Sequence, residues 1–147
     1  MERPQPSERG DYRHFLTITT RWMDNDIYGH INNVQYYSYF DTVINRFLID
    51  RGVLDIHNGE VIGLAVESHC NYFSSAAFPD DIEAGIRVAH LGRSSVRYEI
   101  GLFVGAREQA IAQGHFVHVY VDRQDSQPVD LSVNLHAALA SISHPVT

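Results

Sequence analysis

The chain has 147 residues, enough for one domain with a substantial core and too few for two ordinary domains. Its hydrophobic fraction of 44% is that of a globular protein, and its net charge of −7 argues against nucleic-acid binding, which usually needs a basic surface. No apolar run is long enough to span a membrane, so we expect no membrane partner.

All basic residues are arginines, and the chain contains no lysine. This excludes mechanisms that depend on lysine, such as Schiff-base chemistry or phosphate binding by a P-loop lysine. The single cysteine, Cys70, cannot form an internal disulfide. A chain without disulfides suits a reducing compartment, so we expect a cytoplasmic protein.

The first predicted elements are a strand and a long helix. Residues 1–10 are rich in Pro, Ser, Glu and Arg and lack the apolar stretch of a secretory signal, so we expect a disordered leader. Alternating β-branched and aromatic residues predict a strand within residues 12–22. Apolar residues spaced by three and four over residues 31–50 predict a largely buried helix, which Gly52 would end.

After this helix the apolar period changes to two. This period predicts four strands, over residues 61–74, 81–92, 94–105 and 109–124. The segment that follows, residues 130–142, is expected to end in a short helix. This element order indicates an α+β fold in which one antiparallel sheet of about five strands curls around the long helix. No repeat or linker is visible, so residues 11–147 are expected to form a single domain.

The stretch DNDIYGHINN, residues 24–33, places many polar residues directly before the long helix. Such residues most often form turns and caps, and Asn32 or Asn33 could cap this helix. The same helix end exposes backbone N–H groups that can hold an oxygen gaining negative charge. Asp26 lies in a turn with Gly29 that could bring a carboxylate close to that end, and this pairing is what acyl transfer requires.

A longer pattern supports the catalytic interpretation. The order R-W-x-D-x-D-x-x-G-H-x-N-N-x-x-Y is formed by Arg21, Trp22, Asp24, Asp26, Gly29, His30, Asn32, Asn33 and Tyr36. It resembles the signature of hotdog-fold acyl-CoA thioesterases, and most closely the 4-hydroxybenzoyl-CoA thioesterase-like branch. The segments FPDDIEAGIRVAHLGRSSVRYEIGLF and VHVYVDRQDSQPVDL are similar to later strands of that family. The predicted element order also agrees with a hotdog, a sheet wrapped around a long central helix.

The resemblance implies hydrolysis of an acyl-CoA thioester to a free acid and coenzyme A, with no cofactor. It places the catalytic carboxylate at Asp26, as nucleophile or general base, and the carbonyl-polarising N–H at Asn33. Gly29 would permit close approach of backbone and ligand, and His30 would position the substrate. Asp24 would serve the turn. Tyr36, with other aromatic residues, could line a pocket for an aryl or an aliphatic acyl group.

Two further regions are candidates for substrate binding. Glu67 lies in a predicted strand, and in other hotdog branches an acidic residue of the helix or adjoining strands performs the chemistry; an exposed strand face is the simpler interpretation. Arg93, Ser94 and Ser95 follow Gly92 in a strand connection. By the resemblance, this connection contacts the nucleotide or pantetheine of coenzyme A, and an arginine fork suits phosphates. The alternative is an ordinary turn.

The sequence also bears on metal binding, on alternative functions and on assembly. The nine histidines show no metal-site spacing, and His115 and His118 would point to opposite faces of a strand, so we expect no metal. A hotdog hydratase or dehydratase using His30 with Asp26, or a non-catalytic acyl-CoA-binding module, are the alternatives. Because an isolated hotdog sheet has an exposed edge, a homodimer with one continuous sheet is expected, and a homotetramer is plausible from the family.

Overall fold

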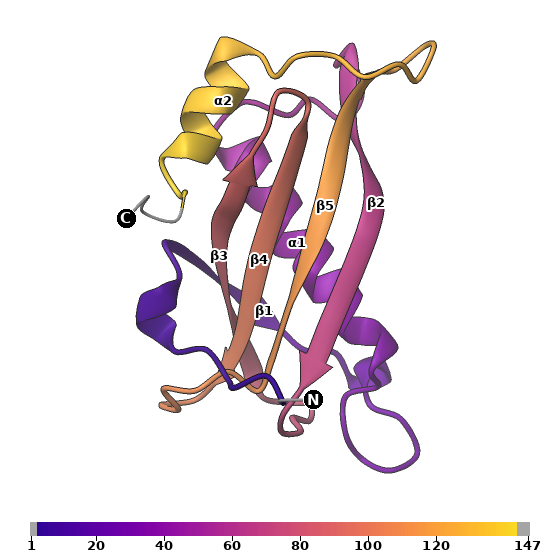
Figure 1. Cartoon of the computed structure of the whole chain (residues 1–147). Coiled ribbons are helices and arrows are strands. Elements are labelled where there is room, and N and C mark those ends of the chain that lie inside the picture. Colours follow the sequence, from indigo (N-terminus) through magenta and orange to yellow (C-terminus); the bar gives the residue numbers. More distant parts are fainter. Residues whose placement is uncertain (1–2, 144–147) are drawn as a thin grey trace.

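Residues 3–143 are described by a computed structural model of the chain. Five antiparallel strands form one sheet in the order β1-β3-β4-β5-β2, and the helix α1 lies across one face of it (Figure 1). The elements are β1 (His14–Thr19), α1 (Val34–Asp50), β2 (Val61–Tyr72), β3 (Asp81–Leu91), β4 (Ser95–Val104), β5 (Ala112–Asp122) and α2 (Val133–Ala140), with short 3-10 helices at Arg9–Asp11 and Trp22–Asp24. The predicted α+β hotdog fold is confirmed.

The core lies between α1 and the sheet. Phe40, Ile44 and Phe47 of α1 are at most 1% exposed, and they pack with apolar residues of β3 and β4 such as Ile86 and Ile100. Burying a side chain of this kind contributes about 1.5–3 kcal/mol. Within residues 3–143, no helix combines the length and apolar character needed to cross a membrane.

The structure defines the first and last residues of α1 more exactly than the sequence pattern does. The helix starts at Val34 instead of residue 31, because Ile31 is held in an isolated antiparallel bridge with Asn25 of the preceding loop. At the other end Gly52 has a φ of 70°, which a glycine adopts without strain. The predicted stop at Gly52 is therefore confirmed.

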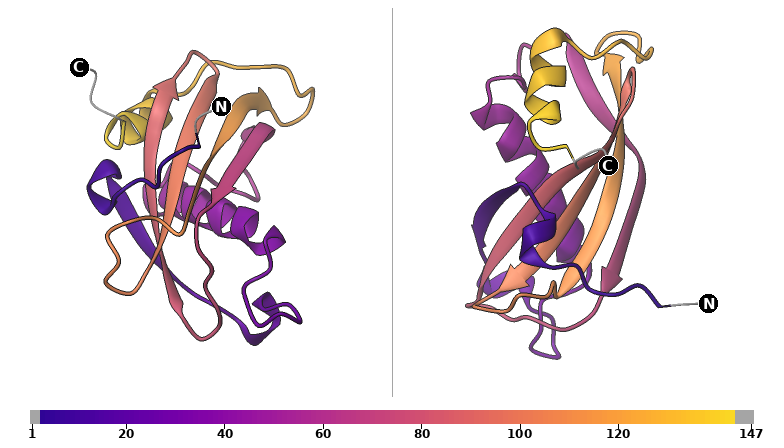
Figure 2. Two further views of the ribbon diagram at one scale, coloured as in Figure 1. Left: turned by 60° about the horizontal axis from the view of Figure 1, so that its bottom comes forward. Right: turned by 60° about the vertical axis from the view of Figure 1, so that its left-hand side comes forward.

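The N-terminal segment differs from the disordered leader that its composition suggested. The backbone of Ser7 accepts a hydrogen bond from Ala110, and Glu8 forms a β-bridge with Gln109. The views in Figures 1 and 2 show the segment crossing the sheet on the face opposite α1. The physical reason is a contact that composition does not reveal: the ring of Tyr12, 7% exposed, fills a slot on that face and anchors the segment.

Candidate active site

The loop between β1 and α1 is folded around the carboxylate of Asp24, which is 1% exposed. This carboxylate accepts hydrogen bonds from the backbone N–H of Arg21 (3.0 Å), the guanidinium of Arg21 (2.9 Å) and the hydroxyl of Tyr39 on α1 (2.8 Å). Burial alone would raise the pKa of Asp24, but these hydrogen bonds outweigh burial and lower the pKa below its usual value. Asp24 therefore fastens the loop to α1 and stays ionised.

Asp26 starts a tight turn on the surface of this loop. Its N–H donates to the carbonyl of His30 (2.9 Å), and its own carbonyl accepts the N–H of Gly29 (3.0 Å). Gly29 has a φ of 81°, a conformation that side chains disfavour, which explains the glycine. One carboxylate oxygen of Asp26 accepts the N–H of Tyr28 (2.9 Å). The other has no partner within residues 3–143, so it remains available to a ligand.

The N–H groups at the start of α1 are almost all occupied. Ile31 donates to Ala76, Asn32 to Asp24, Val34 and Gln35 to the side chain and carbonyl of Asn32, and Tyr36 to the carbonyl of Asn33. Between Ile31 and Tyr36, only the N–H of Asn33 lacks a partner among the described residues. The sequence left open which asparagine caps the helix. In the structure Asn33 occupies the N-cap position without a side-chain cap bond, and the side chain of Asn32 accepts the N–H of Val34 instead. The N–H of Asn33 is left for a ligand.

The free carboxylate oxygen and the free N–H belong to the same surface groove. Asp26, His30, Asn33 and Tyr36 all line this groove, which has a volume of about 500 Å³. Gly29 lies beside it, in an adjoining hollow that shares Asp26 as a wall. The structure thus brings together the five residues that the motif nominated around the helix start.

Sequence reasoning missed the segment of this groove formed by residues 72–75, of which Tyr72 and Ser74 have the most informative contacts. The hydroxyl of Tyr72 donates to the carbonyl of Asn33 (3.2 Å), and its ring meets that of Tyr36 edge-on at 5.0 Å between centroids. The hydroxyl of Ser74 is buried and has no partner among the described residues. Tyr72 is the last residue of β2 and Ser74 follows it, and no local pattern in the sequence connects them with the helix start.

The other predicted binding residues do not share this groove within one chain. Glu67 lies on the face of the sheet opposite α1, where its carboxylate contacts Nε2 of His115 (2.7 Å). Arg93 lies in the turn between β3 and β4 together with Ser94 and Ser95. Figure 1 shows this turn at the end of the sheet remote from the loop before α1. Arg93 is 86% exposed there and forms an ion pair with Asp130 (2.7 Å).

The titratable groups elsewhere do not suggest a metal centre. Within residues 3–143, no cluster of three His, Cys, Asp or Glu side chains could hold a metal ion. His115 and His118 lie on opposite faces of β5, as the sequence predicted. Burial lowers the pKa of His118 to about 4, and burial raises the pKa of Cys70 to about 11. At neutral pH His118 is therefore uncharged and Cys70 is a thiol, which makes it a poor nucleophile.

Comparison with known proteins identifies the superfamily of the chain. Residues 20–139 match the thioesterase-like superfamily, and the chain belongs to that superfamily. A crystallised protein from Pseudomonas aeruginosa is 54% identical, with a TM-score of 0.94 over 98% of this chain and 100% of that chain. No curated protein sequence matches the chain.

More distant structures share the fold. A DHNA-CoA thioesterase from Staphylococcus aureus has a TM-score of 0.78 at 19% identity, covering 87% of this chain and 89% of its own. A 1,4-dihydroxy-2-naphthoyl-CoA thioesterase from Synechocystis has a TM-score of 0.78 at 14% identity, covering 86% and 94%. At these identities the similarity shows a common fold, and it says nothing of a common substrate.

Proposed function

We propose that this protein hydrolyses an acyl-CoA thioester to a free acid and coenzyme A. One observation carries the proposal: Asp26 and Asn33 line the same groove, and the N–H of Asn33 at the start of α1 has no partner within residues 3–143. A carboxylate facing an oxyanion donor suits acyl transfer, and membership of the thioesterase-like superfamily supports thioester hydrolysis in general.

The mechanism has two parts. The N–H of Asn33, at the positive end of α1, donates a hydrogen bond to the thioester carbonyl and stabilises the negative charge that develops on its oxygen. Asp26 then removes a proton from a water molecule, whose oxygen adds to the carbonyl carbon while the C–S bond breaks and the thiolate leaves. In the alternative route Asp26 itself attacks, forms a mixed anhydride, and water hydrolyses that anhydride. Water is the only co-reactant in either route, so we propose no metal or other cofactor.

A second candidate is a hydratase or dehydratase that uses His30 with Asp26. The observation in its favour is that His30 lines the same groove, in the turn that the Asp26 N–H closes. A non-catalytic acyl-CoA-binding module would use the same groove without turnover. These possibilities differ in their products: free thiol, an altered acyl thioester, or unchanged substrate.

The deciding measurement is thiol release from short-chain, long-chain and aromatic acyl-CoAs. We expect the purified protein to release coenzyme A from at least one of these classes. Absence of thiol release from all of them would refute hydrolysis. Mass spectrometry of the acyl thioester in the same reactions would then distinguish a hydratase, which changes the acyl mass by one water, from a binding module.

We also propose that the chain forms a homodimer through β2, with a homotetramer as a pair of such dimers. β2 is one of the two edge strands, and Leu64 and Val66 in its middle are 41% and 61% exposed. A long apolar edge strand favours pairing with another strand. Because Tyr72 at the end of β2 lines the groove, a partner chain on this edge would lie beside the site.

The oligomeric state can be measured by sedimentation velocity. We expect at least a dimer, and Val66→Lys is expected to shift the protein toward the monomer, because antiparallel pairing about the middle of β2 brings the two lysines together. A wild-type protein that remains monomeric at micromolar concentration would contradict the proposed pairing.

A further inference from the structure

The groove beside Asp26 offers no cation for the phosphates of an acyl-CoA. Its lining contains one histidine and no arginine, and the chain has no lysine. Phosphates bind best to arginine, whose guanidinium can donate two parallel hydrogen bonds. Arg93, which the resemblance nominated, lies at the remote end of the sheet. If the substrate is an acyl-CoA, other residues must bind its nucleotide.

Two further hollows follow the groove around the end of β2. The groove shares Tyr72 and Phe73 with a hollow of about 400 Å³ that is also lined by residues 3–6 and Asn71. That hollow shares Asn71 with another of about 370 Å³. Because neighbouring side chains of a strand point to opposite faces, Tyr72 faces α1 and Asn71 faces away. The end of β2 is therefore the rim between the groove and the opposite face.

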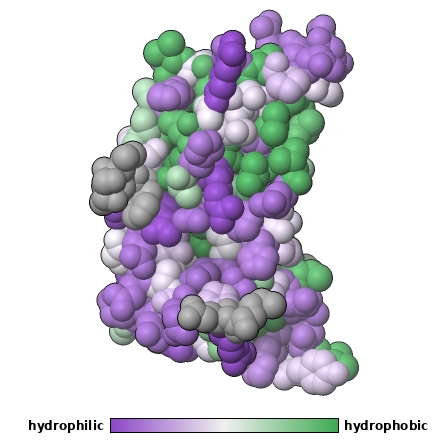
Figure 3. All heavy atoms as spheres, in the orientation of Figure 1, coloured by the Kyte–Doolittle hydropathy of each residue, from purple (hydrophilic) through white to green (hydrophobic). Residues whose placement is uncertain are grey.

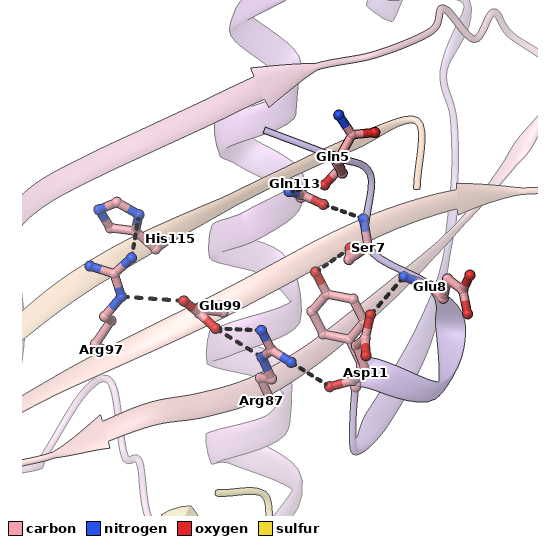
Figure 4. A network of polar contacts seen from close by, with 10 residues as sticks. Gln5, Ser7, Glu8, Asp11, Arg87, Arg97, Glu99, Gln113 and His115 are labelled. Carbon is pink, nitrogen blue, oxygen red and sulfur yellow. Dashed lines mark hydrogen bonds and ion pairs between the residues drawn. The ribbon is translucent and has the colours of Figure 1, made fainter. Parts of the chain in front are cut away.

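The hollow on the opposite face contains a network of charged side chains (Figure 4). Oε1 of Glu99 accepts from Arg87 (2.8 Å), and Oε2 of Glu99 accepts from Nε of Arg97 (3.4 Å). Nη1 of Arg87 donates to the carbonyl of Asp11 (3.0 Å). Because Nε and Nη2 contact Glu99, every nitrogen of the Arg87 guanidinium already has a partner in the protein. Figure 3 shows that hydrophilic side chains gather over the middle of this face.

Arg97 is the guanidinium of this network that can still bind a ligand. Its Nη1 has no partner within residues 3–143, and its side chain is 39% exposed. Nη2 of Arg97 meets Nδ1 of His115 at 3.2 Å, and Nε2 of His115 meets the carboxylate of Glu67 at 2.7 Å. Since arginine can only donate, Nδ1 of His115 accepts in this contact, and Nε2 faces the carboxylate of Glu67.

The two hollows are together cationic in a protein that is acidic overall. Arg3, Arg87 and Arg97 line them, against the single carboxylate of Glu99. Arg3 adds its charge beside Asn71 and Tyr72, between the groove and the network of Arg97. An anion reaching over the rim of β2 from the groove would therefore meet Arg3 first and Arg97 next.

We propose that these two hollows bind the pyrophosphate and 3′-phosphate of a coenzyme A substrate, with Arg3 and Arg97 as the direct contacts. The pantetheine arm crosses the end of β2 beside Tyr72 and places the thioester next to Asp26 and Asn33. This inference rests on the proposed thioesterase function, because it assumes a substrate that carries the nucleotide.

The test compares two substrates with the same acyl group, an acyl-CoA and the corresponding acyl-pantetheine, which lacks the nucleotide. Arg97→Ala and Arg3→Ala are each expected to raise KM for the acyl-CoA about tenfold, because each removes a charge-assisted hydrogen bond. Their kcat values and their KM for acyl-pantetheine should remain close to those of the wild type. Arg46→Ala is the matched control: it removes one positive charge from the exposed side of α1, where Arg46 pairs with Asp50 (3.0 Å).

Binding of free coenzyme A, measured by calorimetry, provides a readout that needs no turnover. Arg3→Ala and Arg97→Ala should weaken this binding about tenfold and leave binding of pantetheine unchanged. Equal losses for substrates with and without the nucleotide would overturn the proposal, as would a loss confined to Arg93→Ala. Wild-type protein that binds coenzyme A through Arg97 but hydrolyses no thioester would instead refute the proposed function and leave the phosphate site standing.

Discussion

Replacing Asp26 by asparagine is expected to lower kcat for thioester hydrolysis by about 10²–10⁴-fold, the usual contribution of a positioned acid–base group. The amide can neither accept a proton from water nor attack the carbonyl, yet its oxygen can still accept the N–H of Tyr28 that holds the turn. The fold should therefore persist. Thiol release under substrate saturation measures the loss, and a urea titration checks that the free energy of unfolding is little changed.

Asp50→Asn is the matched control for this substitution. Asp50 is an exposed carboxylate at the end of α1 that, among the residues the structure describes, pairs only with Arg46, so its loss changes the net charge equally without touching the groove. Full activity of Asp26→Asn would eliminate Asp26 as the catalytic carboxylate. His30→Ala should cost less than Asp26→Asn, and the opposite order would favour the hydratase alternative.

The second large effect is expected from Gly101→Ala, which should lower the free energy of unfolding by about 2–3 kcal/mol, within the range of overpacking. Gly101 and Gly85 face each other across the β3–β4 ladder, and the absence of side chains there forms the slot for Tyr12. A Cβ on Gly101 would lie 2.5 Å from Cε2 of Tyr12, so the ring must leave the slot. Equilibrium unfolding in urea measures the change.

A double-mutant cycle separates this effect from a general weakening of β4. Once Tyr12→Ala has emptied the slot, adding Gly101→Ala should cost much less than it does in the wild type, because the two residues are coupled only through their contact. Additive costs would show that Gly101 acts through the strand itself. Loss of protection of residues 7–11 in hydrogen exchange should accompany either single substitution, because Tyr12 anchors the N-terminal segment.

The parts of the fold that the sequence predicted are those governed by short-range periodicity. The spacing of apolar residues distinguished α1 from the strands that follow, and Gly52 marked the end of the helix. The sequence also predicted the part of the groove whose contacts join residues that are close together in the chain. The N–H of Asp26 donates to the carbonyl of His30, and the side chain of Asn32 accepts the N–H of Val34. Residues 24–33 therefore form the turn and the start of the helix mainly through contacts between near neighbours in the chain.

Composition gave a wrong prediction where contacts with a distant part of the chain determine whether a segment is ordered. The residues before Tyr12 have the composition of a disordered segment, but the slot that anchors them depends on two glycines that meet only when β3 and β4 pair. Arg93 was nominated from its place in a motif, yet the length of β3 and β4 keeps its turn at the far end of the sheet.

The sequence by itself therefore determined the kinds of element and the local turn that holds Asp26 and Asn33. Only the tertiary structure decided what surrounds that turn: Tyr72 and Ser74 line its groove, and Arg3 and Arg97 line the hollows that follow across the rim. The physical reason is that these contacts join residues far apart in the chain. Their positions follow from strand order and from the register of β2 on β5, and a shift of one residue in that register would move each side chain to the other face.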